Sequence, residues 1–142
     1  MNQTVVIFRV SLVAYALLVS AALVKALLIG HGHLPEAALA YLKWWRETPQ
    51  STVERAVGWI GLVATASSIV SALAMTIFAR WARPAFAACT VLIIALTPFM
   101  DFPVLKTPGE YFLEELWDAL AGAIIVFSYW SKTADRFARN AP

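Results

Sequence analysis

The chain has 142 residues, of which 61% are hydrophobic and 14% are charged, and its mean hydropathy is +0.70. A soluble domain carries charge on roughly a quarter of its positions, so this composition excludes an ordinary soluble domain and indicates a protein embedded in lipid. The net charge of +2, with basic residues scattered along the chain, argues against a nucleic-acid partner.

Four apolar segments are long enough to cross a bilayer as helices, which takes about 20 residues for a hydrocarbon layer of about 30 Å. They cover about 5–30, 52–79, 84–100 and 108–131. The third is short, so it is expected to stand upright or to end in an unwound stretch near Pro98. The sequence therefore predicts a single all-α integral membrane domain over 1–142, built as a four-transmembrane-helix bundle.

The loop after the first segment carries its own helical pattern between about 35 and 47. Apolar residues recur there at helical spacing, while charged residues point elsewhere. The apolar set is Leu34, Ala38, Tyr41, Leu42 and Trp45, and the charged set is Glu36, Lys43 and Glu47. This pattern predicts a short amphipathic helix on the outer membrane surface, with Leu42 and Trp45 turned inward.

Two helix starts carry capping signals. Ser51 and Glu54 have the spacing of a capping box before the second segment, and Thr107 and Glu110 repeat it before the fourth. The second segment also has a face of small residues at spacings of three and four. They are Gly58, Gly61, Thr65, Ser68 and Ala72. Such a face allows close helix packing, either within the bundle or between subunits.

Basic residues set the expected orientation. One group lies in a short amino end, a tight turn and a short tail: Arg9, Arg80, Arg83, Lys132, Arg136 and Arg139. The other group is spread over two longer loops: Lys25, Lys43, Arg46, Arg55 and Lys106. The denser group favours a cytoplasmic position for both termini and for the turn at 80–83.

The start of the fourth segment is acidic, with Glu110, Glu114, Glu115 and Asp118. Glu110 and Glu114 fit a solvated helix start, where acids complement the helix dipole. Asp118 is different, because counting back from Trp130 places it roughly 10 Å inside the hydrocarbon. An ionised acid there requires a partner or a proton. Lys25 lies at a similar depth and is the expected partner, with Arg55 as the fallback, unless Lys25 extends to the interface instead.

Other chemistry-bearing residues carry weak signals. Cys89 is the only cysteine and fits a small buried residue, so no internal disulfide is expected. The stretch His31-Gly32-His33 is interpreted as a polar helix end rather than a metal site. Motifs for nucleophilic hydrolases, zinc proteases and phosphate-binding loops are absent from the sequence. We therefore expect no enzyme activity, metal or cofactor.

Two resemblances bear on function. The stretches Tyr129-Trp130-Ser131-Lys132, Asp135-Arg136-Phe137 and Arg80-Trp81-Ala82-Arg83-Pro84 resemble small uncharacterised four-helix inner-membrane proteins of Gram-negative bacteria, a group without an assigned activity. The layout is also similar to that of immunity proteins against pore-forming bacterial toxins. These resemblances imply a protein of the bacterial inner membrane.

The leading hypothesis is a non-enzymatic protein that binds a protein partner, in an immunity or accessory-subunit role, or that self-associates in the membrane. The expected partner surface on the outer face comprises Tyr41, Trp44, Trp45, Glu110 and Glu114. The alternative is a small oligomeric transporter or ion-coupled carrier with Asp118 or Glu115 as its coupling carboxylate. A third possibility is a membrane enzyme that acts on lipid or quinone.

Overall fold

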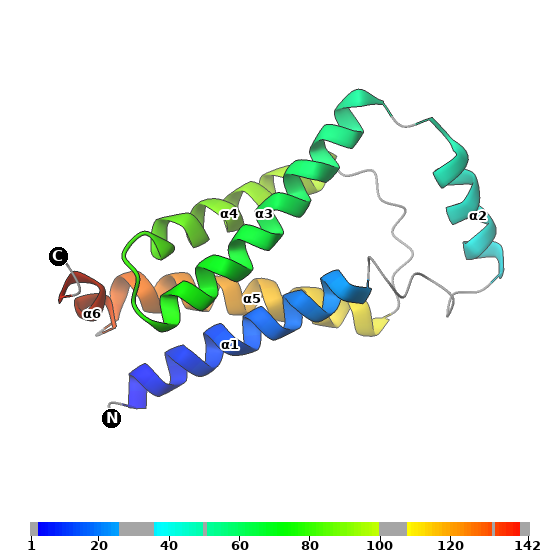
Figure 1. The fold of residues 1–142 in the computed structure, drawn as a ribbon. Helices are drawn as coiled ribbons and strands as arrows, with labels where there is room; N and C mark the ends of the chain where they lie inside the picture. Colours follow the sequence, from blue (N-terminus) through cyan, green and yellow to red (C-terminus); the bar gives the residue numbers. More distant parts are fainter. Residues whose placement is uncertain (1–2, 26–35, 50, 100–107, 132, 140–142) are drawn as a thin grey trace.

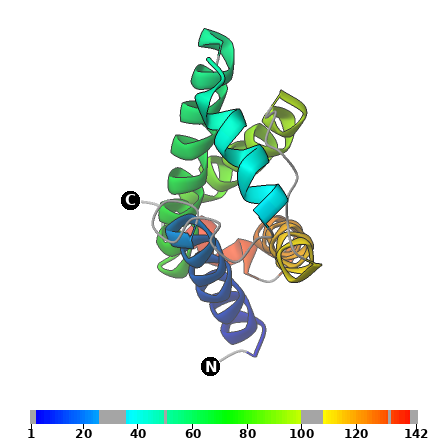
Figure 2. The same cartoon turned by 90° about the vertical axis from the view of Figure 1, so that its right-hand side faces the viewer.

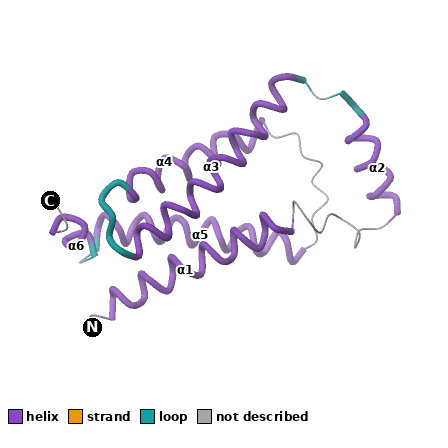
Figure 3. Tube along the Cα trace, viewed as in Figure 1, coloured by secondary structure: helices purple, strands orange, loops and turns teal. Residues whose placement is uncertain are grey.

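The computed structural model describes residues 3–25, 36–49, 51–99, 108–131 and 133–139. Its elements are α1 (Gln3–Val24), α2 (Glu36–Glu47), α3 (Thr52–Thr76), α4 (Ala82–Leu96), a 3-10 turn (Thr97–Phe99), α5 (Pro108–Trp130) and α6 (Ala134–Arg139). Every element in these ranges is helical, which confirms the predicted all-α class (Figure 3).

Figure 1 shows α1, α3, α4 and α5 running along a common direction, with α3 and α4 as an antiparallel hairpin. α3 packs on α4 and on α1, and α1 also packs on α5. Both termini, the α3–α4 turn and α6 lie at one end, which we call the terminal end (Figure 1). The opposite end, at which α2 lies, is called the α2 end.

Three described segments are long and apolar enough to cross a membrane: Gln3–Val24, Thr52–Thr76 and Ala82–Phe99. The predicted helical membrane protein is confirmed at this level. α5 has 23 residues, but any 18 consecutive residues within it include Glu114, Glu115 and Asp118. Three carboxyl groups, and not a lack of length, therefore distinguish α5 from the other long helices.

The helix bounds differ from the predicted ones mainly at the α3–α4 turn, which covers 77–81 instead of the predicted 80–83. α3 ends at Thr76 rather than at 79, and α4 begins at Ala82, with Pro84 in its first turn. Proline is tolerated there because the first amide groups of a helix have no partner within it. The 3-10 turn at Thr97–Phe99 contains Pro98, in agreement with the predicted unwinding near that residue. The described part of the first helix ends with a π turn at Lys25.

The capping box before α3 is confirmed. The Ser51 hydroxyl accepts a hydrogen bond from the Glu54 amide at 3.1 Å, and the Glu54 carboxylate accepts one from the Ser51 amide at 2.5 Å. Both side chains therefore satisfy amide groups that the helix start would leave without partners. α5 begins at Pro108 as expected, whereas Thr107 lies outside the described residues.

The turn after α3 is closed by a residue with positive φ. Phe78 has φ of 58°, the left-handed region usually taken by glycine. Two backbone bonds complete the motif, from the Phe78 amide to the Met75 carbonyl at 3.0 Å and from the Ala79 amide to the Ala74 carbonyl at 3.2 Å. A side chain in this region costs about 1 kcal/mol or more. The compensation lies in the Phe78 ring, which is only 4% exposed.

That ring belongs to an aromatic cluster of Phe8, Phe78 and Phe137, contributed by α1, the turn and α6. The Phe78 and Phe137 centroids are 5.0 Å apart, and each lies 6.2 Å from the centroid of Phe8. Close ring pairs of this kind add stabilisation beyond area burial. The cluster thus joins segments from both ends of the sequence and holds the α3–α4 turn in place.

The buried core lies toward the terminal end. The buried residues of α4 are Ala82 and Phe86, at its start, and those of α5 are Ala121, Ile124 and Ser128, in its second half. In contrast, no described side chain of 87–99 or of 111–120 is buried. The chain therefore packs its own helices tightly at the terminal end and leaves the α2 end of α4 and α5 without a buried core.

Candidate functional site

The short helix predicted between about 35 and 47 is present as α2, which covers Glu36–Glu47, while Pro35 lies outside the described residues. It lies across the direction of the long helices and apart from them (Figures 1 and 2). Trp44 is 59% exposed, and Glu36, Lys43 and Glu47 are exposed as well. The side chains of Tyr41, Leu42 and Trp45 lie outside the described ones, so their orientation stays a prediction.

The acidic start of α5 lies at the same end of the molecule as α2. Glu114 is half-buried, while Glu115 and Asp118 are exposed. The side chain of Glu110 lies outside the described ones. Glu114 and Asp118 are four residues apart and so share a face of α5. The structure therefore brings α2 and a negatively charged helix start to one end of the bundle.

A polar contact that the sequence analysis did not single out joins α1 to α3. The hydroxyl oxygens of Tyr15 and Ser68 are 3.0 Å apart, and both side chains are buried. Ser68 also donates its single hydroxyl proton to the Thr65 carbonyl at 2.8 Å. The phenol of Tyr15 must therefore donate to Ser68. The sequence gives only a weak signal for this contact, because Tyr15 is a lone tyrosine in an apolar run.

The Asp118 side chain is exposed rather than enclosed by the bundle. Lys25 is half-buried in the π turn that ends the described part of α1, and Arg55 is exposed in the first turn of α3. The pairing of Asp118 with Lys25, or with Arg55, stays a prediction.

The small-residue face of α3 is used within the chain along much of its length. Gly61, Ser68 and Ala72 are buried, and Thr65 is half-buried and bonds back to the Gly61 carbonyl at 2.9 Å. At Gly58, an added Cβ atom would meet nothing within 4 Å. The face therefore supports close packing toward the terminal end and opens toward the α2 end.

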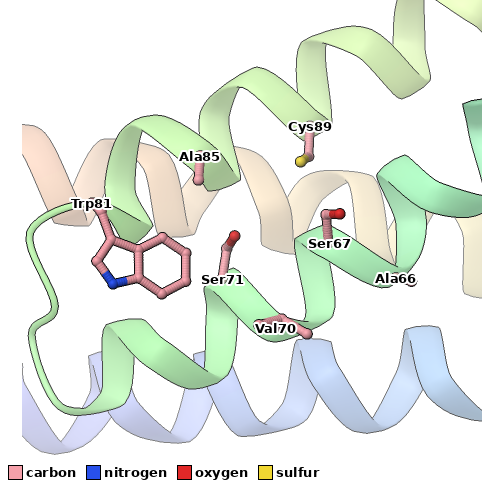
Figure 4. A pocket seen from close by; sticks show the side chains of 7 residues that line it. All are labelled: Ala66, Ser67, Val70, Ser71, Trp81, Ala85 and Cys89. Carbon is pink, nitrogen blue, oxygen red and sulfur yellow. The ribbon is translucent and has the colours of Figure 1, made fainter.

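A shallow groove of about 390 Å³ lies between α3 and α4 (Figure 4). In Figure 4, Ser67 and Ser71 of α3 face Ala85 and Cys89 of α4, and the Trp81 ring lies at the end near the α3–α4 turn. Its lining is mainly apolar and small. Cys89 is half-buried rather than buried as predicted, and it is free because the sequence contains no other cysteine.

The described residues contain no group of three histidine, cysteine, aspartate or glutamate side chains placed to hold a metal ion. His31 and His33 lie outside the described residues. Comparison with family models, with curated proteins and with solved structures finds no match to this chain.

Proposed function

We propose that the chain is a non-enzymatic protein of the bacterial inner membrane that crosses the bilayer four times and binds a protein partner at its α2 end. α5 would be the fourth span, because its 23 residues extend about 35 Å and it lies along α1. Both termini would be cytoplasmic, as the dense basic group at 80–83 and in the tail favours.

The observation that carries the proposal is the contrast within α4 and α5. Their segments toward the terminal end contain buried residues, whereas the described side chains of 87–99 and 111–120 contain none. Helix faces that the chain does not cover itself are available to another protein. An immunity protein or an accessory subunit would use such a surface to bind its partner. α2, which lies across the direction of the long helices, would extend this surface beyond the bundle.

The partner surface would combine aromatic and acidic groups. Trp44 is 59% exposed on α2, and Tyr111 is 44% exposed near the start of α5. Exposed aromatic residues of this kind are common anchors of protein interfaces. The carboxyl groups of 114, 115 and 118 would favour a partner whose facing surface is basic.

Photo-crosslinking in intact cells tests this proposal. A photoreactive phenylalanine would replace Trp44 at the α2 end or, as the matched control, Trp130 at the terminal end, which is 77% exposed. We expect one recurrent protein adduct from position 44 and none from position 130. Equal adducts at both positions, or adducts with lipid alone at position 44, would overturn the proposal.

Sidedness is tested separately with a membrane-impermeant maleimide. In a Cys89→Ser background, cysteine at Thr48 should be labelled from outside the inner membrane, and cysteine at Asp135 only after the membrane is opened. Both positions are exposed, so access is decided by the membrane and not by folding. Labelling of Asp135→Cys in intact spheroplasts would reverse the proposed orientation.

A second candidate function is an oligomeric ion-coupled carrier with Asp118 or Glu115 as its coupling carboxylate, because both residues belong to the helix that packs along α1. A carboxylate within a membrane-spanning helix is a site at which a proton or cation can bind. If Asp118 instead forms a structural pair with Lys25, removing both charges should be better tolerated than removing one.

The double variant Lys25→Met with Asp118→Leu distinguishes these roles. Recovery of expression and of partner cross-linking together would support the structural pair. The other outcome is a double variant that folds and still forms the cross-link but does not restore the wild-type phenotype in a deletion strain. That outcome would support a coupling role for Asp118.

A further inference from the structure

Charge is segregated along the molecule. Five of the 11 basic residues belong to described segments at the terminal end: Arg9, Arg80, Arg83, Arg136 and Arg139. Asp135 is the only one of the 9 acidic residues in those segments. The terminal end therefore carries a strong positive charge, while the remainder of the chain is net negative.

Three of these arginines are held against the same aromatic cluster. The guanidinium carbons of Arg9 and Arg136 lie 5.4 Å and 6.0 Å from the Phe78 ring centroid. The guanidinium carbon of Arg83 lies 4.7 Å from the Phe137 centroid. Because the Phe78 and Phe137 centroids are only 5.0 Å apart, the three cations gather around one small group of rings.

Backbone carbonyl groups fix two of the three further. Arg9 Nε donates to the Thr76 carbonyl at 3.1 Å, and Arg83 Nη1 donates to the Ser128 carbonyl at 3.0 Å. Arg83 is also stacked over Tyr129 at 5.1 Å. These contacts position the guanidinium groups without neutralising them, because carbonyl oxygens and ring faces carry no net charge.

The local charge is not balanced by a carboxylate in the described part of the chain. No ion pair joins Asp135 to Arg9, Arg83 or Arg136 among these residues. Arg83 Nε is buried and has no hydrogen-bond acceptor in the structure. Like charges around one cluster repel each other, so an anion that approached them would be bound favourably.

We propose that Arg9, Arg83 and Arg136 form a binding site for a phosphate group, supplied by the headgroup of an anionic phospholipid. Guanidinium groups match the geometry of phosphate oxygens, and the terminal N–H groups of Arg9 and Arg136 can bind them through paired hydrogen bonds. Arg83 contributes mainly its charge, because its Nη1 is bonded to the Ser128 carbonyl and its Nε is buried. The cluster lies at helix ends next to apolar membrane segments, which is the level of lipid headgroups. Basic pockets between membrane helices bind acidic lipids in this way.

The site lies at the end opposite to α2, so it is independent of the proposed partner surface. Its lipid would bridge α1, the α3–α4 hairpin and α6 and would stabilise the aromatic cluster they share. Such a lipid would also offset the repulsion between the three cations.

The test is native mass spectrometry of the full-length chain in neutral detergent, titrated with dioleoyl phosphatidylglycerol, dioleoyl phosphatidylcholine or inorganic phosphate. We expect phosphatidylglycerol to bind selectively. The variant Arg9→Gln with Arg136→Gln should weaken that binding about 25-fold, or about fivefold for each charge removed. The matched control is Arg80→Gln, because Arg80 is exposed and makes no hydrogen bond, ion pair or cation–ring contact among the described residues.

The outcomes separate the sources of phosphate. Equal binding of phosphatidylglycerol and phosphatidylcholine would overturn the site. It would also be overturned if Arg80→Gln weakened phosphatidylglycerol binding as much as the removal of each cluster arginine does. If inorganic phosphate saturates the site and displaces the lipid completely, the phosphate group that the site binds does not come from a lipid headgroup. If the double variant fails to fold, Arg136→Lys decides, because it keeps the charge but loses the paired geometry and should weaken phosphatidylglycerol binding by several-fold.

Discussion

The two ends of the bundle are built differently. At the terminal end, Phe8, Phe78 and Phe137 are buried together, and α6 contacts the α3–α4 turn through the Phe137–Phe78 ring pair. At the α2 end, no described side chain of 111–120 is buried, and α2 lies apart from the long helices (Figure 1). Regions with few buried contacts open most easily and are often the ones used for binding. We infer that the terminal end stabilises the fold and that the α2 end is available for binding a partner.

The largest expected effect concerns the aromatic cluster. Phe8→Ala removes a fully buried ring and should lower the free energy of unfolding by about 3 kcal/mol or more. Phe112→Ala is the matched control at the α2 end, since its ring is 66% exposed, and it should cost less than about 1 kcal/mol. Unfolding in mixed micelles, followed by circular dichroism, measures both. Equal losses would remove the contrast between the ends.

At the left-handed residue in the α3–α4 turn, glycine should be a better replacement than alanine, which is the reverse of the order within a helix. Phe78→Ala and Phe78→Gly both remove the ring, but glycine accepts φ of 58° without strain. Phe78→Gly should therefore be more stable than Phe78→Ala by about 1 kcal/mol.

The matched pair for this prediction is Met75→Ala and Met75→Gly, one turn earlier in α3, where the order should be opposite. The same micelle unfolding assay compares all four variants. If glycine is the worse replacement at both positions, the backbone at 78 does not carry the expected strain.

A local effect of about 1 kcal/mol is expected where α3 begins. Ser51→Ala removes one half of the capping box and leaves the Glu54 amide without its acceptor. This turn is exposed, so the change should speed amide exchange over 52–55 and leave exchange at the terminal end unchanged. Thr52→Ala is the control, because the Thr52 side chain has no hydrogen bond in the structure. A change in exchange throughout the bundle would show that the α2 end is coupled to the core.

The smallest expected effect concerns the Tyr15–Ser68 contact between α1 and α3. A double-mutant cycle with Tyr15→Phe and Ser68→Ala should give a coupling of about 0.6 kcal/mol, the average for hydrogen bonds between membrane helices. Tyr15→Phe combined with Ser128→Ala should be additive, since Ser128 bonds within its own helix to the Ile125 carbonyl. Coupling in both cycles would point to a general loosening of the core instead of this hydrogen bond.

Local signals in the sequence account for much of the secondary structure. The capping box at Ser51 and the short helix over 36–47 follow from residue spacing, and the structure contains both. The unwinding around Pro98 likewise follows from local chemistry. These features depend on neighbours within a few residues, which is why they can be predicted without knowledge of the packing.

The sequence by itself determined a helical membrane protein, because its composition and long apolar runs admit only lipid as the solvent. It could not determine which helix faces meet, because that depends on contacts between distant segments. The tertiary structure decided that Tyr15 bonds to Ser68, which lies 53 residues away, and that Phe78 takes a left-handed backbone against Phe8. It also gathered three arginines from separate helices around one aromatic cluster, where no short-range pattern places them together.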